Sequence, residues 1–367
     1  TAMATLWVAV RRFQVSENLA AVVVGIFFAA PPMTSYATQI YPEMPAALAV
    51  VTCIGIITGS MSKSKVFGLI LSLTALPWLS VKYVPVTVVL AFIFFSRNWK
   101  TEKKKLAFFS GVMLLSAIIY LIIHKRVYGG WTVYASGDHF VNGEFEVFGR
   151  SPNLFARTRR LAGLLFDTQF GLIPWAPAFF ALIPAFALLI RDRVKFSIDL
   201  ILCTCTGWGV ATWVALTMHG WWWPGRQLVV ILPAAIIAMA ILAEKNKIWK
   251  WFIFLGGVAG TGAWLWLAFE ATTDRRTLVV DFYETSYPIY RALSTISPDF
   301  RDFDQRATFL NAIWLVALVV AIALTVFRKQ SNPLKNPALT YRETSQIIVI
   351  EGTRKKIKTS KKVFDNH

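Results

Sequence analysis

Long apolar stretches are the feature that most constrains how this chain can fold. The longest, 197–218 and 307–327, approach the roughly 20 residues that a helix needs to cross about 30 Å of hydrocarbon. Only 16% of the residues are charged, whereas about a quarter are charged in a typical globular protein. The sequence therefore predicts an all-α, polytopic bundle of membrane helices and excludes a water-soluble enzyme.

We expect about eleven apolar segments. Residues 1–10 are too few to span a bilayer and end at Arg11 and Arg12, so we expect them to be the second half of a helix that starts upstream. Segments 66–79 and 84–95 are short, and we expect a tight hairpin, a re-entrant pair or tilted helices there. The other expected segments are 19–34, 44–58, 106–123, 172–190, 197–218, 227–242, 251–269 and 307–327.

Basic residues indicate how these segments are oriented. With the C-terminal tail inside, alternation of the segments places 25 of the 38 Lys and Arg residues and 8 of the 20 acidic residues on the inner side. The inner surface then carries +17 and the outer surface +1, as the positive-inside rule expects. The net charge of +18 therefore indicates membrane orientation, and we expect no nucleic-acid partner.

The expected organisation is one transmembrane domain, 1–327, followed by a basic tail, 328–367. The tail is polar, and we expect it to be cytoplasmic and mostly disordered. The large outer loops are expected at 124–171 and 270–306, and they would form a layer over the outer face of the bundle. We expect any catalysis to take place on the outer side. We also expect the chain to be an integral membrane protein of a bacterial plasma membrane.

Residues 153–167, inside the first large outer loop, have the pattern of an interfacial helix. Leu154, Leu161 and Leu165 fall on one helical face, while Arg157 and Arg160 lie off it. Such a helix is expected to lie flat beneath the lipid headgroups.

Three charged residues at the outer membrane edge are candidate site residues, since a charge near the hydrocarbon costs about 2.5–3.5 kcal/mol. Glu43 precedes an outer helix start, where it would complement the positive helix terminus, bind substrate or metal, or do both. Lys82, at the bend between the two short segments, would be a snorkelling anchor or part of a site. Arg226 precedes another helix N-terminus, which already carries positive partial charge, so we expect an anion to share its position.

Several other kinds of site are not expected. The four histidines and three cysteines form no recognisable metal-binding cluster. Neither a phosphate-cradling glycine loop nor a Gly-x-Ser-x-Gly nucleophile elbow occurs, which argues against nucleotide-driven transport and serine hydrolysis. No cofactor is assigned with certainty. A divalent metal bound by Glu43 stays an open alternative.

Five motifs occur in the order found in one family of membrane enzymes. They are PPMTSYATQIYPEMP at 31–45, Lys82 with Pro85, Tyr128-Gly129-Gly130, LLFDTQFGLIPWAPAFFALIP at 164–184, and GWWWPGRQLVVILP at 220–233. Together they resemble motifs of the GT-C superfamily of membrane glycosyltransferases, which includes protein O-mannosyltransferases and aminoarabinose transferases. The resemblance covers most of the chain up to residue 327.

The resemblance implies an inverting transfer of a sugar from a polyprenyl phosphate to a hydroxyl of a glycan, lipid or protein acceptor. Lys82 and Arg226 would bind the donor phosphate, and Glu43 would take a second acidic position that binds metal, donor or acceptor. The family's principal catalytic Asp belongs to a first outer loop that would precede Thr1. We therefore expect the main base upstream and this fragment to be inactive alone.

Four further residues are implied as contacts of the sugar or the acceptor, namely Tyr41, Tyr128, His219 and Trp222. Two other functions stay open beside the transferase. A lipid or sugar transporter or flippase would line a path with the same charges, whereas a noncatalytic assembly subunit predicts that the outer polar residues do not converge. The discriminating observation is whether Glu43, Lys82 and Arg226 surround one outer cavity joined to a lipid-facing groove.

Overall fold

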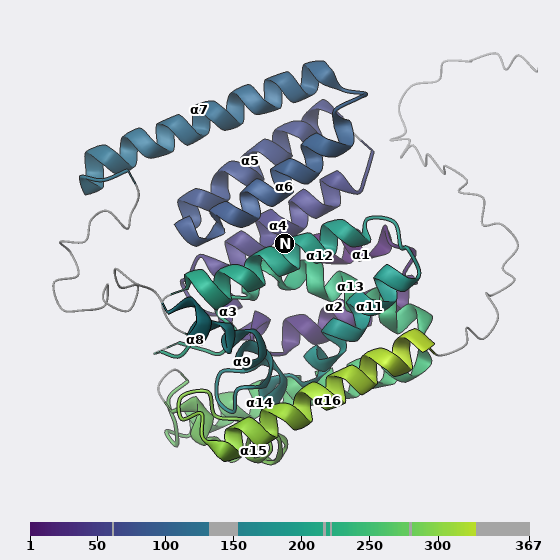
Figure 1. Cartoon of the computed structure of the whole chain (residues 1–367), viewed down its shortest axis with the longest axis vertical. Coiled ribbons are helices and arrows are strands. Elements are labelled where there is room, and N and C mark those ends of the chain that lie inside the picture. The colour runs from purple at the N-terminus through teal and green to yellow at the C-terminus, as the bar shows by residue number, and fades with distance from the viewer. Residues whose placement is uncertain (61, 132–152, 216–217, 221, 279–280, 328–367) are drawn as a thin grey trace, which may run out of the picture. The chain divides into compact units, whose positions relative to one another are not determined.

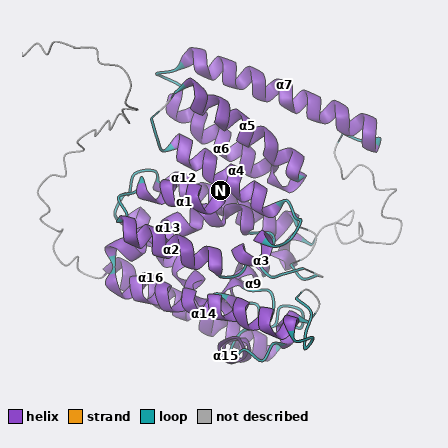
Figure 2. Ribbon diagram, turned by 180° about the vertical axis from the view of Figure 1, so that it is seen from behind, coloured by secondary structure: helices purple, strands orange, loops and turns teal. Residues whose placement is uncertain are grey.

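The computed structural model is built from helices (Figure 1). It describes residues 1–60, 62–131, 153–215, 218–220, 222–278 and 281–327, and no strand occurs among them (Figure 2). The all-helical prediction is therefore confirmed. The tail 328–367 and residues 132–152 of the first outer loop lie outside the described residues.

The first part of the chain contains seven α-helices and a short 3-10 helix, η1 (Val81–Tyr83), among the described residues. The α-helices are α1 (Ala2–Arg11), α2 (Glu17–Ala29), α3 (Met33–Ala37), α4 (Glu43–Ile57), α5 (Lys63–Leu79), α6 (Val84–Asn98) and α7 (Lys103–Tyr128).

The second part begins with two short helices, α8 (Leu154–Thr158) and α9 (Arg160–Phe166). They are followed by α10 (Leu172–Trp175), η4 (Pro177–Ala181), α11 (Leu182–Arg191), α12 (Ser197–Gly209), the π-helical turn η5 (Val210–Val214), η6 (Val229–Ile231), α13 (Leu232–Lys245), α14 (Lys247–Thr272), η7 (Phe282–Glu284), α15 (Pro288–Thr295) and α16 (Gln305–Phe327).

Five helical stretches in the described part of the chain are long and apolar enough to cross a membrane: Val81–Asn98, Lys103–Val127, Ser197–Val214, Lys247–Thr272 and Gln305–Phe327. Four shorter apolar helices accompany them: Ala2–Arg11, Glu17–Ala29, Glu43–Ile57 and Pro177–Arg191. Each of the eleven predicted segments falls on helix, but the structure supports five full spans by length and composition, compatible with an integral membrane protein.

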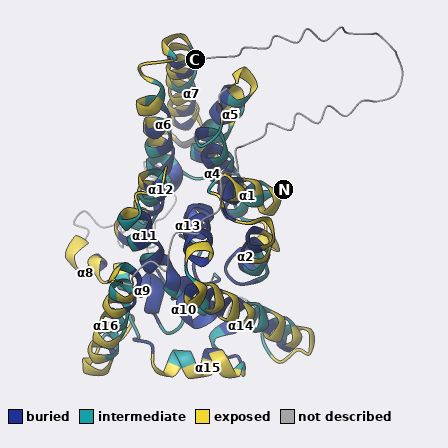
Figure 3. Cartoon of the chain, turned by 90° about the vertical axis from the view of Figure 1, so that its right-hand side faces the viewer, coloured by how far each residue is buried: buried dark blue, intermediate teal, exposed yellow. Residues whose placement is uncertain are grey.

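Helix α13 forms the centre of the core (Figure 3). Every residue from Leu232 to Ala243 is buried, and α13 contacts α1, α2, α4, α11, α12 and α14. A helix that is apolar all round has no face suited to water, so burial on all sides is its stable position. Five alanines in this stretch let the surrounding helices approach closely.

Helices α7 and α16 lie at the periphery and expose apolar side chains. Only 17% of the best apolar window of α7 and 11% of that of α16 are buried. Phe108 on α7 and Phe309 on α16 are 61% and 65% exposed. An apolar surface of this extent is unfavourable in water and is typical of contact with lipid.

The predicted segment 172–190 is interrupted rather than continuous. It forms α10, then η4, then α11, and the helix breaks at Ala176, directly before Pro177, because proline lacks the backbone N–H and disfavours helical geometry in the residue before it. The interruption packs against α14 at a glycine. A Cβ atom added at Gly256 would lie 2.6 Å from the backbone nitrogen of Ala178, so the two backbones meet too closely for any side chain.

The predicted interfacial helix at 153–167 is wrong in form. Residues 154–166 make two short helices, in which Leu154 and Leu161 are exposed but Leu165 is buried. The Arg157 guanidinium donates to the carbonyl oxygen of Trp213 at 2.6 Å, and Arg160 donates to that of Ala215 at 2.8 Å. Both arginines thus satisfy backbone carbonyls around the π-helical turn η5, where the regular helical hydrogen bonding of α12 stops.

Ion pairs join several of the helix ends that carry the predicted inner charges. Arg97 at the end of α6 pairs with Asp199 in the first turn of α12. Lys245 at the end of α13 pairs at 2.8 Å with Asp192, which follows α11. Burial opposes ionisation of Asp192, but hydrogen bonds from Arg191 and Lys245 lower its pKa below the usual value.

Candidate functional site

Glu43, Lys82 and Arg226 come together although they lie on three separate segments. Glu43 is the first residue of α4, Lys82 lies in η1 between α5 and α6, and Arg226 lies in the turn before η6. Helix α4 contacts both α5 and η6, which brings the two cationic segments to the start of α4. The sequence marked each residue separately, and the structure places them in one cluster.

One carboxylate oxygen holds both cations. Lys82 Nζ donates to Glu43 Oε1 at 2.9 Å, and Arg226 Nε donates to the same oxygen at 2.9 Å. Lys82 Nζ also donates to Oε1 of Gln227 at 3.2 Å. We call these four residues the Glu43 cluster. Glu43 is 0% exposed, so its charge is removed from solvent and depends on the two cations.

The anion predicted to share the position of Arg226 is therefore present within the protein, as Glu43. Lys82 does not reach outward as a snorkelling lysine would. Its side chain is only 16% exposed, and its Nζ donates to the buried Glu43. The start of α4 also places the Glu43 carboxylate at the positive helix terminus, so the helix contribution and the ion pairs act together.

The cluster has unused hydrogen-bonding capacity. Arg226 uses Nε for Glu43, and its two terminal nitrogens make no hydrogen bond to the described residues, while the side chain is 22% exposed. The buried Glu43 Oε2 and the buried Tyr83 hydroxyl likewise have no partner among those residues. Buried polar atoms are nearly always hydrogen-bonded, so the cluster leaves hydrogen-bonding positions that water or a ligand could fill.

Aromatic rings surround the cluster. The Arg226 guanidinium lies 4.4 Å from the ring centroid of Tyr41 and 5.3 Å from that of Trp222. Lys82 Nζ lies 5.1 Å from the Tyr83 centroid. Two of the four residues implied as sugar or acceptor contacts, Tyr41 and Trp222, therefore lie beside the cationic side of the cluster.

A buried tyrosine ties the two sides of the cluster together. The Tyr36 hydroxyl donates to the backbone oxygen of Trp223 at 2.6 Å, which joins the 31–45 and 220–233 stretches. Burial raises the pKa of Tyr36 well above its usual value, although Arg226 opposes this. Burial would lower the pKa of Arg226, but the hydrogen bond to Glu43 outweighs it and raises that pKa. Tyr36 is therefore neutral and Arg226 charged at physiological pH.

Gly225 fixes where Arg226 lies. Its φ of +77° is in the left-handed region, which favours glycine. A Cβ atom there would also lie 2.8 Å from Leu172 Cδ2 and 2.9 Å from Pro32 Cγ. The turn can therefore approach 31–32 closely only with glycine at this position.

The remaining implied contacts lie elsewhere or are only partly described. His219 Nε2 lies 3.3 Å from Oδ2 of the buried Asp167, in a second polar group. Asp167 also accepts backbone N–H groups of Gln169, Phe170 and Phe300, so it ties the 164–184 stretch to the loop before α16. Tyr128 is the last residue of α7, and its side chain is outside the described part.

The described residues do not support the metal site that the sequence left open. No group of three or more His, Cys, Asp or Glu side chains that could hold a metal ion occurs among the described residues. Glu43, the expected ligand, already faces two cations, which would repel a third positive charge. We therefore assign no step to a metal.

An apolar groove runs along α5 and α7, with a volume of about 430 Å³. Phe67, Leu71 and Trp78 of α5 face Leu115 and Ile119 of α7 across it, and all five are well exposed. Trp78 ends the groove, where its ring lies 5.1 Å from that of Tyr120. Lys82 follows Trp78 by four residues, so at most about 14 Å of chain separates them.

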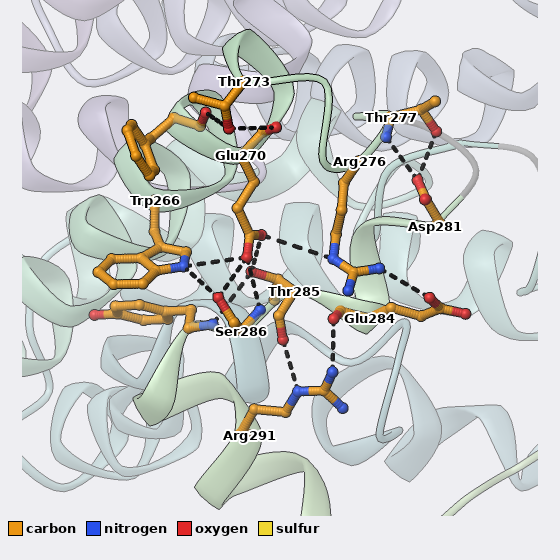
Figure 4. Close-up of polar contacts among 12 residues, drawn as sticks. Trp266, Glu270, Thr273, Arg276, Thr277, Asp281, Glu284, Thr285, Ser286 and Arg291 are labelled. Carbon is orange, nitrogen blue, oxygen red and sulfur yellow. Dashed lines mark hydrogen bonds and ion pairs between the residues drawn. The ribbon is translucent and has the colours of Figure 1, made fainter.

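A second buried carboxylate, Glu270, was not singled out from the sequence. It lies in the last turn of α14 and is 3% exposed. Its oxygens accept hydrogen bonds from Thr285 Oγ1 at 2.6 Å, Ser286 N at 2.9 Å, Ser286 Oγ at 2.5 Å and Trp266 Nε1 at 3.3 Å (Figure 4). We call Glu270 and these three partners the Glu270 cluster.

A signal for the Glu270 cluster was present in the sequence. An acid at a helix C-terminus faces the negative end of the helix dipole and needs compensating donors, and the hydroxyl pair Thr285-Ser286 follows 15 residues later. Arg276 Nε lies 4.0 Å from Glu270, and its Nη1 binds the exposed Glu284 at 2.8 Å. The cluster ties the end of α14 to the segment around η7.

Comparison with known proteins adds no relative to this description, since no protein family, characterised protein or solved structure matches the chain.

Proposed function

We propose that the chain is a membrane glycosyltransferase that takes a sugar from a polyprenyl phosphate at the outer membrane face, and that the Glu43 cluster binds the donor. The observation that carries the proposal is the convergence of Lys82 and Arg226 on one buried oxygen of Glu43. The motif resemblance supplies the reaction class, and the cluster supplies a chemically suitable site for the donor's phosphate.

Charge favours a phosphate here. Two cations around one carboxylate leave the cluster with a net charge of +1. The free terminal nitrogens of Arg226 form the planar fork that suits two phosphate oxygens, and Tyr41 and Trp222 hold that fork from the sides. A phosphate would thus add to the Arg226–Glu43 pair without displacing it.

The reaction proposed for this site is an inverting displacement. An acceptor hydroxyl attacks the anomeric carbon, the bond from that carbon to the phosphate oxygen breaks, and polyprenyl phosphate leaves with the electron pair. The hydroxyl proton passes to a carboxylate base. Arg226 and Lys82 would stabilise the negative charge that develops on the leaving phosphate. Hydrogen-bond donors that are already positioned at such a charge lower the barrier strongly. Glu43 Oε2 is buried and receives no hydrogen bond from the described residues, so it would accept a hydrogen bond from a hydroxyl of the sugar or acceptor.

The groove along α5 and α7 suits the hydrocarbon chain of such a donor. It is apolar, opens toward lipid and ends at Trp78, close along the chain to Lys82. Binding energy from a chain held there would help to orient the phosphosugar. The convergence of the three charges also argues against a noncatalytic assembly subunit, for which no convergence is expected.

The test is donor binding by the purified protein in detergent and sugar transfer by the full-length protein, with Arg226→Ala and Lys82→Ala compared with Arg276→Ala. Arg276 is a matched control because it also neighbours a buried carboxylate on the same chain. We expect each site variant to weaken polyprenyl-phosphate binding tenfold or more, about 1.4 kcal/mol, and the control to keep wild-type affinity.

Equal affinities in all three variants would remove the phosphate site. Donor binding with movement of intact donor across vesicles, and no transfer to any acceptor, would instead support the transporter or flippase alternative.

A further inference from the structure

A second groove lies between α2 and α14, at the end of the bundle where both helices begin. Its volume is about 250 Å³, and Leu19, Val22 and Ile26 of α2 line it together with Phe254 of α14. Asn18, Lys250 and Trp251 complete its lining at the helix starts. The groove is thus apolar along its length and polar at one end.

The polar end carries cations without protein partners. Lys247 and Lys250 are both exposed, and neither makes an ion pair with the described residues. The carboxylates at this end are engaged elsewhere: Glu17 lies 3.7 Å from Arg11, and Glu244 accepts the N–H and hydroxyl of Ser16 at 2.9 Å each. Positive charge at the mouth of the groove is therefore left for a ligand.

We propose that this groove binds an anionic phospholipid, with its phosphate at Lys250 and Asn18 and one acyl chain along α2 and α14. The nine residues from Asn18 to Ile26 span about 12 Å of helix, which fits the first part of an acyl chain. Trp251 suits the boundary between headgroup and hydrocarbon, where indole rings are enriched. Basic pockets between membrane helices recognise anionic headgroups in this way.

The charge at the groove mouth selects this occupant. A zwitterionic lipid would fill the apolar part equally well but would leave Lys250 without a net anionic partner. The site is independent of the Glu43 cluster, since none of its lining residues belongs to that cluster. Its test therefore stands whether or not the protein transfers a sugar.

Native mass spectrometry of the purified protein would measure retained lipid after addition of phosphatidylglycerol or phosphatidylcholine with identical acyl chains. We expect the wild-type protein to retain more phosphatidylglycerol and Lys250→Gln to lose about fivefold of that binding. Lys104→Gln is the matched control, because Lys104 is an exposed lysine in the first turn of α7 and does not line the groove. It should bind as the wild-type protein does.

A second measurement locates the acyl chain. Phosphatidylglycerol with a photoreactive acyl chain should cross-link to peptides of α2 and α14, and Val22→Trp, which fills the groove, should reduce those cross-links. Equal retention of both lipids by the wild-type protein, unchanged binding in Lys250→Gln, or cross-links spread evenly over the exposed helices would each overturn the site.

Discussion

The Glu43 and Glu270 clusters each bury a carboxylate at a helix end, yet they satisfy it in different ways. Glu270 receives four hydrogen bonds from neutral hydroxyl, amide and indole donors, and both of its oxygens are used. Glu43 receives two bonds from cations on one oxygen, while the other has no partner among the described residues.

Sequence distance reinforces the contrast. The partners of Glu270 lie within 16 residues of it, whereas Lys82 and Arg226 lie 39 and 183 residues from Glu43. A carboxylate whose two oxygens are both hydrogen-bonded by nearby residues is suited to joining neighbouring segments of the fold. The Glu43 cluster instead joins distant segments, carries surplus positive charge and leaves one oxygen without a partner among the described residues, and the proposed donor site rests on that difference.

The largest expected effect concerns stability at Glu270. Glu270→Ala leaves the buried Thr285 hydroxyl without its acceptor, and an unsatisfied buried donor costs roughly 1–3 kcal/mol, whereas the exposed Ser286 and Trp266 can turn to water. We expect a loss of about 2 kcal/mol in the free energy of unfolding, measured by denaturation in detergent. Glu284→Ala is the control, since Glu284 is 55% exposed and should change stability by less than about 0.5 kcal/mol. Equal losses in the two variants would contradict a structural role specific to Glu270.

The next effect concerns activity at Glu43. Glu43→Gln keeps the size of the side chain but removes the charge that holds Lys82 and Arg226, so sugar transfer by the full-length protein should fall tenfold or more, about 1.4 kcal/mol of transition-state stabilisation. Glu270→Gln should keep its turnover while losing stability. If turnover per folded molecule falls equally in both, the two clusters do not differ in function.

A smaller effect is expected when Arg226 is replaced by lysine. Arg226→Lys keeps the charge but removes the planar fork and the stacking against Tyr41 and Trp222, so the donor's KM should rise about threefold to tenfold. Arg276→Lys should leave the KM unchanged. A wild-type KM in Arg226→Lys would show that charge alone suffices at this position.

The smallest effect separates two buried tyrosines. Tyr83→Phe removes a hydroxyl with no partner among the described residues and should leave the melting temperature unchanged. Tyr36→Phe breaks the bond to Trp223 and should cost about 1 kcal/mol. If Tyr83→Phe leaves stability intact but weakens donor binding, the unfilled position belongs to the ligand. A clear loss of stability in Tyr83→Phe would instead indicate that its hydroxyl already has a partner, such as a buried water.

The apolar segments were predictable as helices, but hydrophobicity over a dozen residues does not distinguish a membrane span from a buried helix, and five stretches of the described part are long and apolar enough to span. Their interruptions were harder to predict. Pro174, Pro177 and Pro184 were visible in 172–190, but hydropathy averages over them, so one continuous segment was expected where α10, η4 and α11 occur. Arg157 and Arg160 were expected off the apolar face of an interfacial helix, since a helical wheel contains no information about the carbonyls that they bind.

The candidate site was predictable residue by residue but not as an assembly. Glu43, Lys82 and Arg226 each stood out because a charge at the membrane edge needs a reason. Their mutual pairing depends on how α4, η1 and the turn at Gly225 pack, which sequence spacing does not reveal. For that reason the sequence did not indicate that Glu43 itself would be an anion beside Arg226.

The order of the Glu43 cluster along the chain has a consequence for biosynthesis. Glu43 is synthesised first, Lys82 follows 39 residues later, and Arg226 follows 183 residues after Glu43. The carboxylate can thus be neutralised by Lys82 as soon as α4, α5 and η1 have folded together, and Arg226 then joins a pair that is already formed. The surplus positive charge is added only when the turn before η6 has been made, so a stalled or shortened nascent chain would contain the neutral pair alone.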